Sequence, residues 1–187
     1  LKNTNFIDDE ENKKIKSLIS INNNNQKKSY WIKKQQLPNI VKKIEAITGI
    51  NSEFYENFNA IVYSKEYIHA GFLDAYDLNS ERGIKYCSKL GQRLYTLVIF
   101  LDNDIIYNFT KLDYKYSSKK NSLLLYKNTK EDCNQRNNNM AHSLINTNSN
   151  SSIILNLYIR EKSRKNKFIL DNNNLLDINQ KKQEKEI

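Results

Sequence analysis

The residues of this chain that could do chemistry lie in two stretches, Tyr63 to Leu101 and Met140 to Ser143. The first stretch contains His69 and Asp74 and the second contains His142, so together they hold both histidines of the chain. Two imidazoles and one carboxylate are the donor types of a facial iron(II) site, which leaves three coordination positions open. Single Asp and His residues are common, however, and Asp74 could equally belong to a turn or a helix cap.

The order and spacing of the surrounding motifs indicate that these residues belong to one site rather than occurring together by chance. A Tyr-rich strand leads into Asp74-Ala75-Tyr76-Asp77, and Gly91-Gln92-Arg93-Leu94-Tyr95-Thr96 then opens a β-rich run. His142 follows at a distance and precedes the apolar run Ile153 to Ile159. This pattern resembles the catalytic domain of prolyl 4-hydroxylase-type iron(II)/2-oxoglutarate dioxygenases, and the resemblance extends to about Lys162. It implies a double-stranded β-helix, the cofactors Fe(II), 2-oxoglutarate and ascorbate, and hydroxylation of a peptide or protein substrate, foremost on proline.

The resemblance places two of three iron ligands. Asp74 takes the position of the family's carboxylate ligand and His142 that of the distal histidine, whereas Phe72 stands at the proximal histidine position. A phenyl ring offers no lone pair to a metal. His69 lies three residues before Phe72. On a regular strand this spacing would put His69 on the opposite face from Phe72 and roughly 10 Å away along the strand. A bulge at Gly71 would correct the face, so His69 stays open as a third ligand, against the alternative of a histidine at the pocket rim.

The resemblance also assigns the 2-oxoglutarate pocket. Tyr63 corresponds to a tyrosine that would hydrogen-bond the distal carboxylate, and Thr96 corresponds to a pocket-side threonine. The lysine that usually binds this carboxylate is replaced by Ser152. Arg160 would lie on the same face of the strand as Ser152. It is eight residues later, roughly 26 Å along the strand, and therefore cannot replace the lysine. A Lys or Arg from another strand could supply the missing charge.

The apolar periodicity predicts helices first and strands afterwards. Helices are expected after an acidic cap at Asp8 and from Pro38 to Gly49, with an Asn-rich loop at Ser20 to Lys28 between them. Short strands are expected at Phe58–Tyr63, Leu94–Leu101, Leu112–Tyr116, Ser122–Tyr126 and Ile153–Ile159. This order predicts an α+β fold, a double-stranded β-helix or jelly roll with N-terminal helices packed on the sheet. We assign residues 1–162 to this domain and residues 163–187 to a Lys/Asn-rich C-terminal extension.

Composition restricts the other classes of function. The net charge of +9 admits an acidic partner, but the lysines are scattered and no nucleic-acid motif accompanies them, so nucleic-acid binding is not expected. No stretch approaches the ~20 apolar residues that span a bilayer, and no membrane association is expected. Cys87 and Cys133 form no metal or redox motif and are typical of free thiols in a reducing compartment, which predicts a cytoplasmic protein. Because the first residue is Leu1 rather than Met, a preceding targeting segment is left open.

Three hypotheses for function follow. The first is an active dioxygenase that hydroxylates a peptidyl residue, with His69 or a water completing the metal site. The second is a non-catalytic jelly roll that binds a peptide or protein partner and holds iron and 2-oxoglutarate weakly or not at all. The third is a basic nucleic-acid-binding domain. The loss of a metal ligand at Phe72 and of a carboxylate cation at Ser152 favours impaired activity.

Overall fold

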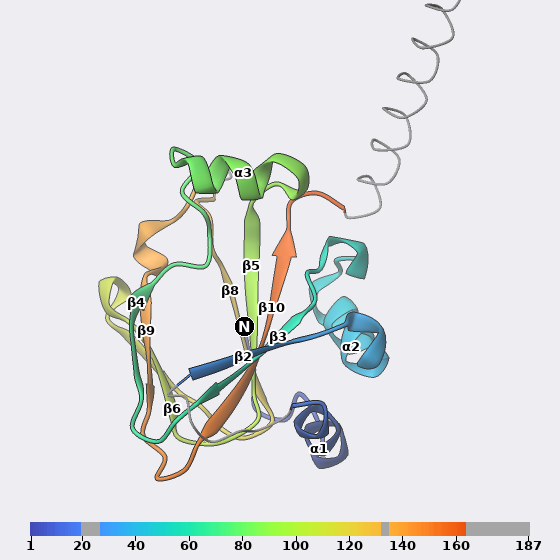
Figure 1. Ribbon diagram of the computed structural model, residues 1–187. Coiled ribbons are helices and arrows are strands. Elements are labelled where there is room, and N and C mark those ends of the chain that lie inside the picture. Colours follow the sequence, from blue (N-terminus) through green and yellow to red (C-terminus); the bar gives the residue numbers. More distant parts are fainter. Residues whose placement is uncertain (20–26, 132–134, 164–187) are drawn as a thin grey trace, which may run out of the picture.

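The computed structural model describes residues 1–19, 27–131 and 135–163. These residues fold into two antiparallel sheets and three α-helices, which Figure 1 shows together. The elements in chain order are β1 (Lys2–Asn3), α1 (Asp9–Ser17), β2 (Lys27–Ile32), η1 (Lys34–Gln36), α2 (Pro38–Thr48), η2 (Ser52–Phe54), β3 (Phe58–Tyr63), β4 (Ile68–Phe72), α3 (Glu81–Leu90), β5 (Arg93–Phe100), β6 (Ile105–Phe109), η3 (Thr110–Leu112), β7 (Tyr114–Ser117), β8 (Ser122–Lys127), η4 (Asn138–Met140), β9 (His142–Asn146) and β10 (Ser152–Arg160).

The two sheets form the walls of a jelly roll. The larger sheet has the strand order β1-β8-β5-β10-β3-β2, and the smaller sheet has the order β4-β9-β6-β7. In Figure 1 the smaller sheet lies at the left, α1 and α2 lie outside the larger sheet, and α3 lies above one end. The predicted double-stranded β-helix with helices packed on the sheet is therefore confirmed.

Strand alternation divides the apolar residues between two cores. Ala60 and Val62 of β3 point outward and join Ile15, Ile40 and other helix residues in one buried cluster. Ile61 and Tyr63 of the same strand point inward and pack against the smaller sheet in a second cluster. Because successive side chains of a strand leave opposite faces, one apolar strand serves both layers. The inner layer is where the candidate site lies.

Local sequence signals explain both N-terminal helices. Asp8 caps α1 through its Oδ1 atom, which accepts a hydrogen bond of 2.8 Å from the Glu11 amide, and Glu11 accepts one from the Asp8 amide in return. Pro38 stands in the first turn of α2, and Gly49 ends that helix with a φ of 66°. This left-handed conformation costs glycine little, because it has no Cβ atom.

The structure also corrects the sequence-based element boundaries. Lys27 and Lys28, expected in the loop, begin strand β2, and Leu112 belongs to the turn η3 rather than to a strand. The sequence did not predict α3, β6 or β9. The segment 164–187 lies outside the described residues, so most of the assigned extension stays a prediction. No helix in the described ranges is long and apolar enough to cross a membrane.

Two isoleucines of α2 test the packing of this helix on the sheet. Ile44 is 0% exposed and Ile47 is 38% exposed. We expect Ile44→Ala to lower the free energy of unfolding by about 2–5 kcal/mol, because it leaves a cavity between helix and sheet. The matched variant Ile47→Ala is expected to lower it by no more than about 1 kcal/mol. Urea unfolding followed by fluorescence measures both, and equal losses would contradict this packing.

Candidate functional site

Asp74 follows strand β4 and turns its carboxylate into the interior of the jelly roll. The residue is 8% exposed. Its Oδ2 atom accepts hydrogen bonds from the Thr96 hydroxyl at 2.9 Å and from the Tyr126 hydroxyl at 2.7 Å. Thr96 in turn accepts a bond of 2.8 Å from the side-chain amide of Asn128. Two neighbouring strands, β5 and β8, thus hold this buried carboxylate in place.

His142 is the first residue of β9 and is brought to the same point. Its Nδ1 atom lies 2.9 Å from the Met140 carbonyl oxygen, which can only accept, so Nδ1 carries the proton. Nε2 faces the interior, 3.9 Å from Asp74 Oδ2. The structure therefore brings together the two residues that the motifs single out.

Tyr126 is a member of this site that sequence reasoning did not single out. Its hydroxyl lies 2.7 Å from Asp74 Oδ2 and 3.3 Å from His142 Nε2. Burial, and then the negative charge of Asp74, raise the pKa of Tyr126 well above its ordinary value, which keeps the phenol protonated and a donor. A signal was available, because a tyrosine ends the inward-facing series Ser122, Leu124, Tyr126 of a predicted strand.

Phe72, which the sequence analysis aligns with the third ligand, lies beside His142. It pairs in register with His142 across β4 and β9, and their ring centroids lie 4.2 Å apart, edge to face. On its other side Phe72 stacks on His69 at 4.1 Å. The phenyl ring thus contacts both histidines of the chain.

His69 reaches the inner face through a bulge in β4. His69 pairs with Leu144 and Phe72 pairs with His142, so three steps along β4 oppose two steps along β9. Its Nε2 lies 3.4 Å from the Lys27 ammonium, and its Nδ1 is buried without a partner in the described part of the chain. Burial lowers the pKa of His69, and the charge of Lys27 lowers it further.

The donor set does not fit a three-ligand iron(II) site. Among the described residues, no group of three or more His, Cys, Asp and Glu side chains could hold a metal ion. Asp74 and His142 supply one carboxylate and one imidazole, and Phe72 supplies no donor. The role of His69 as a ligand stays a prediction.

The residues assigned to the 2-oxoglutarate pocket lie on the inner face of the larger sheet. Thr96 is turned to Asp74, as described above. Tyr63 and Ser152 pair directly across β3 and β10, and both are buried. The Ser152 hydroxyl donates a bond of 2.9 Å to Asn146 Oδ1, so it contributes a neutral group where a cation is expected. Burial, followed by the charge of Asp74, raises the pKa of Tyr63.

Solved structures with the same architecture identify the fold. A viral collagen prolyl hydroxylase from Paramecium bursaria Chlorella virus-1, in its 2-oxoglutarate complex, matches with a TM-score of 0.65 and 20% identity, over 86% of this chain and 94% of its own. A Pseudomonas putida prolyl-4-hydroxylase matches with a TM-score of 0.52 and 8% identity, over 87% and 92% of the two chains. The chain has the fold of the prolyl 4-hydroxylases.

A third prolyl hydroxylase shares this fold, from Trichoplax adhaerens in complex with a peptide fragment of the hypoxia inducible factor oxygen degradation domain. It matches with a TM-score of 0.54 and 11% identity, over 90% of this chain and 86% of its own. No protein-family model matches the sequence, and no curated protein matches it significantly. The likeness to prolyl 4-hydroxylases therefore lies in the fold, at sequence identities of 8–20%.

Arg93, from the Gly91-Gln92-Arg93 stretch, is the first residue of β5 and forms a buried ion-pair cluster. It forms two hydrogen bonds of 2.8 Å to the Glu56 carboxylate, and its guanidinium lies 3.6 Å from the ring centroid of Tyr158. Arg160 approaches the same carboxylate at 3.4 Å. Such a paired, buried cluster joins the start of β3 to β5 and β10, which makes Arg93 a structural residue here.

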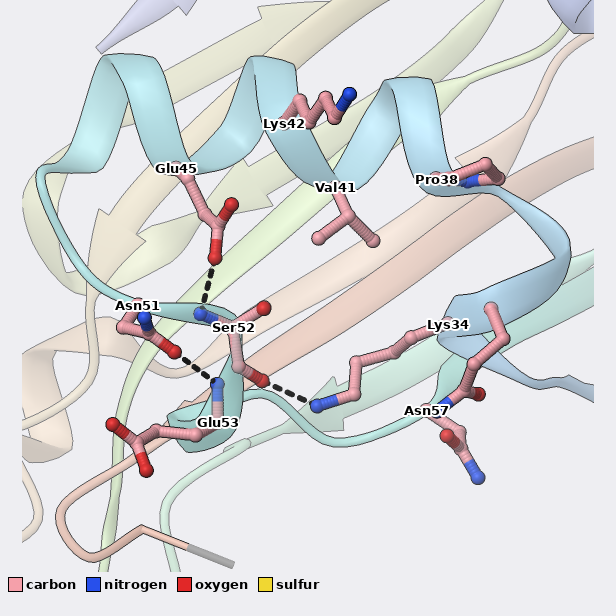
Figure 2. A pocket seen from close by; sticks show the side chains of 10 residues that line it. Lys34, Pro38, Val41, Lys42, Glu45, Asn51, Ser52, Glu53 and Asn57 are labelled. Atoms are coloured by element: carbon pink, nitrogen blue, oxygen red, sulfur yellow. Dashed lines mark hydrogen bonds between the residues drawn. The ribbon is translucent and has the colours of Figure 1, made fainter.

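A hollow of about 520 Å³ lies between α2 and η2, away from the interior site (Figure 2). Two of its charged side chains, Glu45 and Lys34, are engaged by their own neighbours. The Glu45 carboxylate accepts a 2.7 Å bond from the Ser52 amide, and the Lys34 ammonium donates to the backbone carbonyl of Ser52 and, at 2.9 Å, to that of Tyr55. These bonds tie η2 to α2, and we assign this hollow a structural role.

The Tyr126 hydroxyl gives a direct test of the site geometry. We expect Tyr126→Phe to lower the free energy of unfolding by about 1.5–3 kcal/mol, because it removes a donor from a buried carboxylate. Tyr114→Phe is the matched control, since its buried hydroxyl has no partner among the described residues, and we expect a change within about 0.5 kcal/mol. Urea unfolding at constant pH measures both variants. Equal losses would show that Tyr126 does not hold Asp74.

Proposed function

We propose that this chain is a prolyl 4-hydroxylase-like domain that binds a peptide and whose iron(II)/2-oxoglutarate hydroxylation of peptidyl proline is impaired. One observation carries the proposal. The phenyl ring of Phe72 packs at 4.2 Å against the imidazole of His142, at the position where the family's proximal histidine would complete the metal site. Metal affinity depends on ligand number and geometry, so two donors should bind iron(II) weakly.

The co-substrate pocket supports the same conclusion. Ser152 stands at the position of the family's carboxylate-binding lysine and engages Asn146 instead. Replacing a lysine by a serine removes a charge-assisted hydrogen bond, which is the strong kind. The two replacements lie on β4 and β10, strands of different sheets, and each removes a group through which the family would hold a cofactor.

Peptide binding is supported by the fold and by an open strand edge. The Trichoplax prolyl hydroxylase with this fold is bound to a peptide. Strand β4 ends the order of the smaller sheet, and its residues Ile68, Ala70 and Gly71 are exposed. An exposed edge strand can pair with an extended peptide through backbone hydrogen bonds. We place the domain in the cytoplasm because the Cys87 thiol is free, as in reducing compartments.

Active hydroxylation is the second candidate. The convergence of Asp74 and His142, with 3.9 Å between Oδ2 and Nε2, favours it. His69 would have to supply the third ligand, and it lies beyond the Phe72 ring that it stacks on. This arrangement favours the impaired domain over the active one.

Restoring the missing imidazole tests the proposal. Purified protein is titrated anaerobically with iron(II), and the wild type is compared with Phe72→His and with the matched control Phe72→Leu. We expect Phe72→His to tighten iron(II) binding by at least about tenfold, since even outer-sphere partners of a ligand change affinity by that factor. Phe72→Leu should leave the weak binding of the wild type unchanged.

Two results would overturn the proposal. Micromolar iron(II) binding by the wild type that His142→Ala abolishes would establish the active candidate instead. Peptide binding is followed through the backbone NMR shifts of β4. If proline-containing peptides leave these shifts of the wild type unchanged, the peptide-binding part of the proposal is wrong.

A further inference from the structure

Three residues form a straight row across the larger sheet. Ser152 of β10 pairs with Tyr63 of β3, and Tyr63 pairs with Lys27 of β2. Directly opposed residues of antiparallel strands put their side chains on the same face. Tyr63 belongs to the interior cluster between the sheets, so Lys27 also lies on the inner face. The row therefore carries a lysine two strands away from Ser152, roughly 10 Å across the sheet.

The Lys27 ammonium turns back along this row toward the interior. It lies 5.7 Å from the ring centroid of Tyr63 and 3.4 Å from Nε2 of His69, on the opposite sheet. The bulge in β4 is what brings His69 to this position. One cation thus bridges the two walls of the jelly roll beside the residue assigned to the 2-oxoglutarate carboxylate.

This group of side chains has donors in excess. No carboxylate of the described residues lies within 4.0 Å of the Lys27 ammonium. An ammonium can only donate, so His69 Nε2 accepts and the ring proton resides on Nδ1, which is buried without a partner in the described ranges. Burial lowers the pKa of Lys27 from its ordinary value, which reflects the cost of a cation without an anion. An anionic ligand would supply the partner that the Lys27 ammonium lacks.

We propose that Lys27, together with His69 and Tyr63, binds the carboxylate of a small acid of the 2-oxoglutarate class, in place of the lysine that Ser152 replaces. The inference rests on the proposed function because it places the acid inside the same jelly roll, but it requires no metal. A small acid of this class is favoured over phosphate, since the aromatic rings of Tyr63, His69 and Phe72 gather at this position and suit a carbon chain better than a fully polar anion.

Calorimetric titration of metal-free, chelator-treated protein with 2-oxoglutarate tests this site without iron. The wild type should bind the acid saturably, and Lys27→Met should weaken binding at least about tenfold, because it removes the charge-assisted bond. Lys28→Met is the matched control. Lys28 pairs with Val62 on the outer face of the same strand, and its replacement should leave the affinity unchanged.

Two further measurements keep the test decisive. In the wild type, the imidazole protons of His69 should shift in NMR spectra on addition of 2-oxoglutarate and not on addition of equal inorganic phosphate. This readout stands even where Lys27→Met fails to fold. Equal affinities of the wild type and Lys27→Met, or no saturable binding of 2-oxoglutarate at millimolar concentration, would overturn the proposal. Because no metal is present, neither result depends on the outcome of the iron(II) titration of the Phe72 variants.

Discussion

The structure depends on the antiparallel register of β10 between β3 and β5. Every residue from Ser152 to Arg160 is buried, and the strand pairs on both sides. A shift of one residue would turn each side chain to the other face, so the apolar residues of both layers hold this register. The same register puts Ser152 beside Tyr63 and Tyr158 beside Thr96. The positions of the interior polar groups are therefore a consequence of how the two cores are filled.

A carboxylate at the interior end of this sheet must be compensated, because an unpaired buried charge costs several kcal/mol, on the order of 3–5. Asp74 lies outside the strands and receives its hydrogen bonds from Thr96 and Tyr126, which stand on adjacent strands. Tyr126 also contacts His142, so hydroxyl, carboxylate and imidazole form one connected network. Such networks are cooperative, and they fix side chains more firmly than separate bonds would.

Much of the fold could be predicted from the sequence because strong local signals determine it. Helix α1 follows the capping residue Asp8, and helix α2 lies between Pro38 and Gly49. Strand β5 falls within the apolar run Leu94 to Leu101, apart from its first residue. Strands β6 and β9 are only five residues long each, so local pattern alone did not reveal them. In the site, motif spacing singled out Asp74 and His142, and the structure places their Oδ2 and Nε2 atoms 3.9 Å apart. Tyr126 and Lys27 were missed because their positions depend on pairing between strands distant in sequence, which periodicity does not report.

The bulge in β4 determines how both His69 and Phe72 face the interior. In a regular strand His69 would point away from the interior, and Phe72 alone would face His142. The extra residue turns both rings inward and produces contacts from His142 to Phe72 and from Phe72 to His69. His69 then meets Lys27 from the other sheet. An aromatic ring between the two histidines separates their lone pairs, which works against shared metal ligation. The same ring stacks on His69, whose Nε2 faces the Lys27 ammonium and whose Nδ1 is buried without a partner in the described ranges, so one backbone irregularity sets the surroundings of both histidines.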